Sequence, residues 1–171
     1  MKRLLIADTG PLIIFTKSGK LQLLRETTGR IVVTNSVMQE CIIKSDKPGA
    51  TIIRKAFEDG TLSFVDDVDL SAALVKTPLD TGEKAAIALA LSMHDPESSL
   101  LIDEVLGRGV AKQYGLRVIG SAGILVVAKR RGVIKKVEPI LREWRQMGYW
   151  LKESLVAQIL RAAGERKTRR P

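Results

Sequence analysis

Apolar residues gather in short runs, and these runs alternate with longer segments whose apolar residues recur at helical spacing. Short apolar runs bounded by turn residues are typical of strands buried in a parallel sheet. Because such strands alternate with helical segments, we expect an α/β fold, a three-layer α/β/α sandwich with a central, mostly parallel sheet. The predicted strands are Leu4–Ala7, Ile31–Val33, Leu62–Val65, Leu100–Ile102 and Leu116–Ile119.

The strongest predicted helix is Glu83–Leu91, which is rich in alanine and leucine and follows the N-cap candidates Asp80 and Thr81. With 171 residues and no internal repeat, the chain is expected to form a single domain over residues 1–163, followed by a basic, disordered tail over residues 164–171. Other predicted helices are Pro11–Lys17, Val37–Ile43, Ala50–Glu58, Val105–Tyr114, Ile124–Arg131, Val133–Arg145 and Lys152–Ala163, with a turn at Asp46–Gly49. The helix over Val133–Arg145 is expected to be broken or capped around Pro139.

Two of the predicted strands end in a carboxylate. Asp8 follows the first apolar run, and Asp103 follows the run at Leu100–Ile102. Right-handed crossovers would bring both residues to the same edge of the sheet, where open α/β sheets bind their ligands. Taken alone, Asp8 or Thr9 is equally well interpreted as the N-cap of the next helix.

Two further acids lie in the first turns of predicted helices and can face the same edge. Glu40 stands among apolar residues, which is unusual for an isolated charge. Glu83 also suits a helix N-terminus, where a carboxylate interacts favourably with the helix dipole. Four converging acids would repel one another strongly without a cation, and ligation by oxygen alone suits Mg²⁺ or Mn²⁺.

Composition narrows the chemistry of this site. With a single cysteine, Cys41, and a single histidine, His94, the chain has no disulfide framework and no Cys- or His-rich metal site. The net charge of +9 indicates a polyanionic partner. Arg108 and Lys112, four residues apart, could flank the acids on one helix face, although each is also interpretable as an ordinary surface charge.

No apolar run approaches the length of about 20 residues that a membrane span needs, and the N-terminus has no signal-peptide pattern. We therefore expect a cytoplasmic protein without a membrane partner. Positive flanks to hold a phosphate backbone, together with acids to hold a metal ion, are what a nuclease needs.

Several segments, in this order along the chain, resemble the PIN-domain ribonucleases, and in particular a VapC-like toxin branch whose helix begins with Gly-Glu. The resemblance runs from Leu4 to Leu160. It is carried by Asp8-Thr9-Gly10-Pro11-Leu12, Val37-Met38-Gln39-Glu40, Leu79-Asp80-Thr81-Gly82-Glu83-Lys84-Ala85-Ala86-Ile87, Leu101-Ile102-Asp103-Glu104 and Gly120-Ser121-Ala122-Gly123-Ile124-Leu125.

The resemblance implies a PIN-like fold and metal-dependent hydrolysis of RNA by an acidic quartet that binds Mg²⁺ or Mn²⁺. It also implies a homodimer and, in toxin–antitoxin operons, a protein antitoxin. One departure is that many PIN proteins carry aspartate at the position where this chain has Glu83. The residues it implies are the quartet Asp8, Glu40, Glu83 and Asp103, with supporting roles for Thr9, Glu104 and Ser121.

Other families with a strand-ending aspartate fit less well. Haloacid-dehalogenase-like phosphatases need a second aspartate where this chain has Gly10, and the phosphate-binding loop signature of nucleotide hydrolases is absent. The alternative that stays open is a catalytically inactive PIN-fold module that binds RNA or a protein. Trp144, Tyr149 and Trp150 are expected to pack internally or at a dimer interface rather than to stack on bases.

Overall fold

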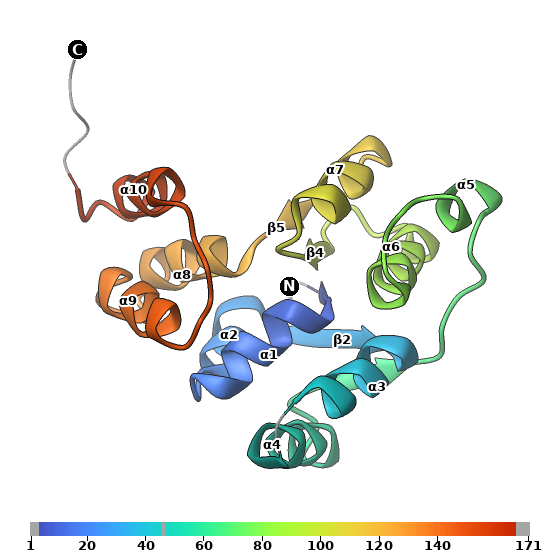
Figure 1. Cartoon of the computed structure of the whole chain (residues 1–171), viewed down its shortest axis with the longest axis horizontal. Coiled ribbons are helices and arrows are strands. Elements are labelled where there is room, and N and C mark those ends of the chain that lie inside the picture. The colour runs from blue at the N-terminus through green and yellow to red at the C-terminus, as the bar shows by residue number, and fades with distance from the viewer. Residues whose placement is uncertain (1–3, 46, 167–171) are drawn as a thin grey trace.

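The computed structural model of the chain describes residues 4–45 and 47–166, which form an α/β fold around a five-stranded sheet (Figure 1). Every strand pair is parallel, in the order β3-β2-β1-β4-β5. The predicted fold class is therefore confirmed. The strands are β1 (Leu4–Ala7), β2 (Arg30–Thr34), β3 (Ser63–Val65), β4 (Ser99–Leu101) and β5 (Val118–Ile119).

Helices cover both faces of the sheet, so the sandwich has three layers (Figure 1). Buried side chains alternate between the two faces along β1, so each face needs a covering layer. Leu5 and Ala7 belong to one buried cluster, whereas Ile6 between them belongs to the other. The cluster on the first face includes residues of α1 (Thr9–Lys17), α2 (Leu21–Thr28), α3 (Asn35–Lys44), α4 (Lys47–Glu58), α8 (Ser121–Arg130), α9 (Glu138–Gln146) and α10 (Glu153–Ala162). The cluster on the second face includes residues of α5 (Ala72–Val75), α6 (Thr81–Met93) and α7 (Val105–Gln113).

The direction of chain winding changes between β1 and β4. From β1 the chain proceeds outward to β2 and β3, and it then returns to build β4 and β5 on the other side. In register, Ala7 pairs with Leu101, and the Asp8 N–H donates to the Leu101 carbonyl at 3.0 Å. The carboxyl ends of these two strands therefore coincide at the position where open α/β sheets bind ligands.

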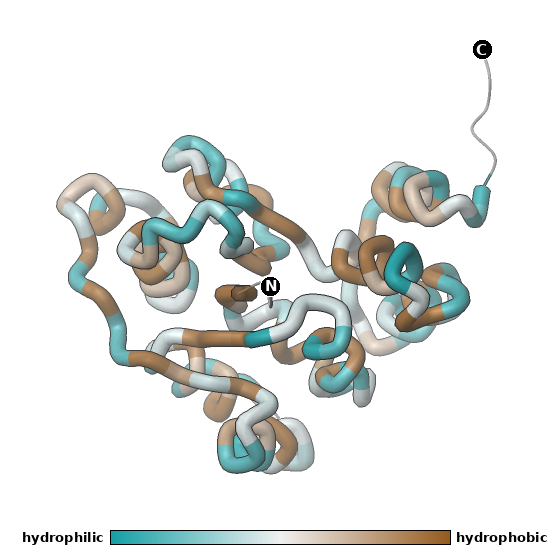
Figure 2. The backbone as a smooth tube through the Cα atoms, turned by 180° about the vertical axis from the view of Figure 1, so that it is seen from behind, coloured by the Kyte–Doolittle hydropathy of each residue, from teal (hydrophilic) through white to brown (hydrophobic). Residues whose placement is uncertain are grey.

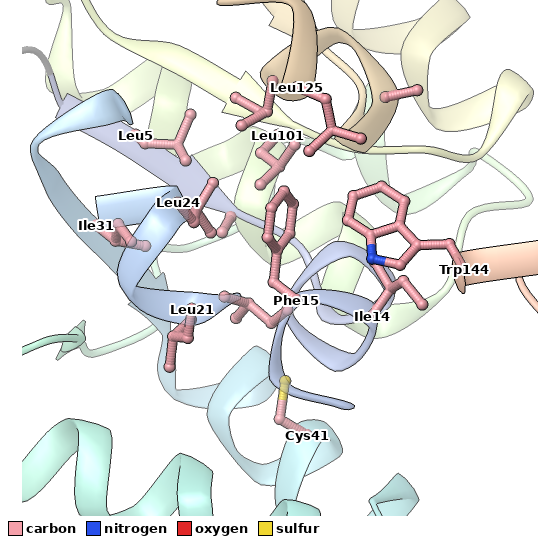
Figure 3. Close-up of a cluster of buried hydrophobic side chains, with 14 of the residues drawn as sticks. Leu5, Ile14, Phe15, Leu21, Leu24, Ile31, Cys41, Leu101, Leu125 and Trp144 are labelled. Atoms are coloured by element: carbon pink, nitrogen blue, oxygen red, sulfur yellow. The ribbon is translucent and has the colours of Figure 1, made fainter. Parts of the chain in front are cut away.

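The larger core cluster is aliphatic apart from a few aromatic rings. Hydrophobic stretches run through the middle of the molecule, while hydrophilic residues gather on its outer turns (Figure 2). Phe15 of α1 lies below Leu101 and Leu125, with the Trp144 indole of α9 beside it (Figure 3). The Phe15 and Trp144 rings meet edge to face, with centroids 5.1 Å apart. This contact fixes α9 against α1.

Two local predictions are wrong. Residues Lys47–Glu58 form one helix where a turn was expected up to Gly49, although Asp46 itself lies outside the described residues. Helix α9 begins only at Glu138, so helix was wrongly predicted over residues 133–137, whereas the expected break or cap around Pro139 is confirmed. Gly132, with a φ of 76°, ends the preceding helix, and Pro139 is favoured in the first turn of the next.

The chain remains attached to the domain beyond the predicted boundary at Ala163. Glu165 accepts hydrogen bonds from the Lys129 ammonium at 2.8 Å and from the N–H groups of Val137 and Glu138 at 2.6 and 2.9 Å. Residues 167–171 of the predicted tail lie outside the described residues. Within the described ranges, no helix is long and apolar enough to span a membrane.

Replacing each tryptophan with alanine should affect the stability of the fold very differently. Trp144 is fully buried, so Trp144→Ala should lower the free energy of unfolding by about 3–5 kcal/mol through the cavity it leaves. Trp150, with 81% of its surface exposed, is the matched control. Trp150→Ala should change the free energy of unfolding by less than about 0.5 kcal/mol. Urea unfolding followed by circular dichroism measures both. Equal losses would contradict this description of the core.

Candidate active site

Asp8 is a buried acid whose side chain is incompletely paired. It occupies the N-cap position of α1, yet its side chain forms no capping hydrogen bond, and its Oδ1 has no hydrogen-bond partner in the part of the chain that the structure describes. Only 6% of its surface is exposed. Burial, with the charges of Asp80, Glu83 and Glu40, raises the pKa of Asp8 to about 7. The helix-cap interpretation therefore does not account for this residue.

Glu40 connects three helices at the sheet edge. Its Oε2 accepts hydrogen bonds from the Thr9 hydroxyl of α1 at 3.1 Å and from the Lys44 ammonium at 3.0 Å. Its Oε1 accepts the N–H of Gly82, in the first turn of α6, at 3.0 Å. A Cβ at Gly82 would lie 3.1 Å from that oxygen, so the absence of a side chain allows the helix to approach closely.

Glu83 serves as a helix cap and still keeps one oxygen free. It forms a capping box with Asp80: the Glu83 N–H donates to Asp80 Oδ1 at 2.8 Å, and the Asp80 N–H donates to Glu83 Oε2 at 3.1 Å. Glu83 Oε1 is buried and has no hydrogen-bond partner among the described residues. Burial, followed by the charges of Asp80, Glu104 and Glu40, raises the pKa of Glu83.

Asp103 is held by several donors. The Ser121 N–H donates to Oδ1 at 2.7 Å, while the Ser121 hydroxyl and the Tyr149 hydroxyl donate to Oδ2 at 2.7 and 2.8 Å. Burial, together with the charge of Asp103, raises the pKa of Tyr149, so its hydroxyl remains a donor at neutral pH. The Arg108 guanidinium lies against Gly120, close to the Asp103 carboxylate.

The other residues that the sequence predicted for the site differ in how directly they contact the four acids. Thr9 and Ser121 hydrogen-bond to the acids as described. Glu104 is exposed at the N-cap position of α7, and its charge reaches Glu83. Arg108 is half-buried beside Asp103, whereas Lys112 is exposed one turn further along α7.

Two residues of the site escaped sequence reasoning. Asp80 was considered only as a helix cap, yet its charge acts on Asp8 ahead of those of Glu83 and Glu40. Its place three residues before Glu83 could have indicated this. Tyr149 was assigned to packing or a dimer interface. Its contact with Asp103 joins residues 46 positions apart, and no local pattern signals it.

The donor chemistry of these residues fits a hard divalent cation. Asp8 Oδ1 and Glu83 Oε1 are buried carboxylate oxygens without hydrogen bonds, and all the acidic side chains offer oxygen only. A complete ligand set is not already assembled, however. Within residues 4–45 and 47–166, no three Asp, Glu, His or Cys side chains are arranged to hold one ion.

A family model described as a PIN domain matches residues 4–165, almost the whole chain. A search of curated proteins finds no match.

The two glycines of α7 provide a test of how closely this helix packs on the site. A Cβ at Gly107 would lie 2.5 Å from Ile102 Cδ1 and 2.7 Å from Glu83 Oε1, whereas a Cβ at Gly109 would meet nothing within 4 Å. Gly107→Ala should therefore lower the free energy of unfolding by about 1–3 kcal/mol through steric overlap. The control Gly109→Ala should raise it by about 0.5–1 kcal/mol because alanine favours helix. Thermal or urea unfolding measures both changes. If Gly107→Ala is more stable than wild type, the close packing of Gly107 against Ile102 and Glu83 is refuted.

The pKa of Asp8 predicts how stability depends on pH in the metal-free protein. Between pH 3.8 and about 7, the folded state binds a proton that the unfolded state has lost. The contribution of Asp8 to the free energy of unfolding should therefore fall as pH rises through this window, by about 4 kcal/mol.

The measurement is urea unfolding in EDTA at several pH values. Asp8→Asn should remove most of the decline and leave a smaller slope from Glu83, whose pKa is also raised. Asp69→Asn, at an exposed loop residue, should keep the wild-type profile. If the stability of Asp8→Asn relative to wild type does not increase between pH 4 and 7, the prediction is contradicted.

Proposed function

The chain belongs to the PIN-domain family, a nuclease-type fold, and on that premise we propose that it is a metal-dependent endoribonuclease. The observation that carries the proposal is the pair of buried carboxylates, Asp8 and Glu83, each with an oxygen that has no hydrogen bond among the described residues. Burying such groups unpaired destabilises a fold, so their presence at a ligand-binding edge supports a functional role.

Four acids would hold the ion. Asp8 and Glu83 contribute their free oxygens. An ionised carboxylate has about four acceptor sites. Glu40 and Asp103 each accept three hydrogen bonds within the described ranges, so each keeps about one site. Bound Mg²⁺ or Mn²⁺ would lower the pKa of water and stabilise negative charge on the phosphate.

The charge distribution supports RNA as the substrate. The net charge of +9 favours binding of a phosphate backbone. Arg108 stands next to Asp103 and is suited to contact a phosphate oxygen, with Lys112 one turn further from the acids. Lys44, half-exposed beside Glu40, adds a third cation at the rim.

The cellular role that we propose is that of a VapC-like toxin, acting as a homodimer in the cytoplasm and neutralised by a protein antitoxin. This part of the proposal rests on the similarity in motif order along the chain.

One observation favours a second candidate, a PIN-fold module that binds RNA or a protein without cutting. No three acidic, histidine or cysteine side chains in the described ranges are arranged to hold an ion. If that arrangement persists in solution, the protein would bind its partner through basic residues such as Arg108, Lys112 and Lys44, without a metal ion.

A cleavage assay separates the two candidates. Wild-type protein incubated with total RNA and Mn²⁺ or Mg²⁺ should cleave it, and EDTA should abolish cleavage. Asp8→Asn, Asp103→Asn and the double variant should lose at least about 100-fold in rate, because each loses a carboxylate ligand. The exposed Asp69→Asn serves as the matched control.

The possible outcomes differ clearly. Equal RNA binding by wild type and double variant, with no cleavage by either, identifies the binding module. Undiminished cleavage by the double variant would mean that these acids do not form the active site.

A further inference from the structure

Tyr149 reaches the acids from a part of the chain that is distant in sequence. It lies in the linker between α9 and α10, and its hydroxyl donates to Asp103 Oδ2 at 2.8 Å. The Ser121 hydroxyl donates to the same oxygen at 2.7 Å. Since a carboxylate oxygen has two lone pairs, these two bonds use the accepting capacity of Oδ2. Among the described residues, Oδ1 accepts only the Ser121 N–H, so it keeps one lone pair.

The tyrosine ring is held by aromatic contacts. It meets Trp144 edge to face, with centroids 5.4 Å apart and planes 73° apart. Trp144 in turn packs against Phe15 in the same manner (Figure 3). Phe15 belongs to α1, whose N-terminus adjoins Asp8. Three rings in successive edge-to-face contact thus connect the helix that follows Asp8 to the hydroxyl that holds Asp103.

The backbone around Tyr149 is fixed as well. Helix α9 is followed by Gly148, whose φ of 86° favours glycine, and the Tyr149 N–H donates to the Trp144 carbonyl at 2.9 Å. Two residues later Leu151 is buried, whereas Trp150 between them is exposed. The linker is therefore anchored on both sides of the exposed tryptophan, with Tyr149 facing inward.

We propose that Tyr149 is a positioning residue for Asp103: by occupying Oδ2, it selects Oδ1 as the oxygen that Asp103 presents to the cation. This role rests on the proposed metal-dependent nuclease function. Removal of the hydroxyl frees a lone pair on Oδ2, so the carboxylate no longer has a single preferred ligand atom. Loss of such hydrogen-bonding partners of metal ligands typically costs 10–100-fold in metal affinity.

The experiment measures Mn²⁺ binding directly, by electron paramagnetic resonance of the free ion, alongside RNA cleavage over a range of Mn²⁺ concentrations. Tyr149→Phe keeps the ring contacts and removes only the hydroxyl. Its dissociation constant for Mn²⁺ should rise about 10–100-fold, and the cleavage defect should shrink as Mn²⁺ increases. Tyr114→Phe, at the chain's other tyrosine, partly exposed after α7, should leave both unchanged.

A double-mutant cycle distinguishes positioning from general support of the fold. In an Asp103→Asn background, Tyr149→Phe should have little further effect on Mn²⁺ binding, because the carboxylate that it orients is gone. An equal further loss there, or wild-type Mn²⁺ affinity in Tyr149→Phe alone, would overturn the inference. If wild-type protein binds no Mn²⁺ and cleaves no RNA, the proposed function fails first, and this inference fails with it.

Discussion

The parallel pairing of β1 with β4 is the constraint on which the site depends. It joins Ala7 to Leu101 in register, so the acids that follow the two strands lie at one edge of the sheet. The chain winds in opposite directions from this pair, so α1 and α7 lie on opposite faces. Helix α6 supplies Glu83 to the same edge, and α3 supplies Glu40. Were β1 and β4 not neighbours, Asp8 and Asp103 would lie on separate strand ends with another strand between them.

This arrangement is intrinsically unfavourable without a counter-charge, and the fold compensates only in part. Glu40 has Lys44 and two neutral donors, and Asp103 has Ser121 and Tyr149. Asp8 Oδ1 and Glu83 Oε1 have no equivalent donors in the described structure, and the pKa of each group is raised accordingly. Natural proteins tolerate unpaired buried groups of this kind mainly where function requires them.

Local patterns were enough to predict the sheet and to propose the four acids as site residues, because a strand-ending carboxylate or a glutamate in a first helical turn is visible within a few residues. Local patterns did not predict features that depend on contacts between residues distant in the sequence. The contact between Tyr149 and Asp103 depends on how α9 packs, and that packing depends on Trp144. The break around Pro139 was expected, yet the apolar spacing also predicted helix over residues 133–137, where the chain after Gly132 forms none before α9. The capping role of Asp80 was correct but incomplete, since burial around Asp8 makes its charge significant there.

The anchoring of Glu165 has a consequence for the far side of the molecule. Val137, at the start of α9, has no side-chain oxygen with which to cap the helix, and the carboxylate of Glu165 accepts the first N–H groups in its place. This is a helix cap supplied from 27 residues downstream, so α9 is complete only when almost the entire chain has been synthesised. Helix α9 carries the ring that supports Tyr149. A truncation that removes Glu165 would therefore loosen the support of an acid that lies more than 60 residues earlier in the sequence.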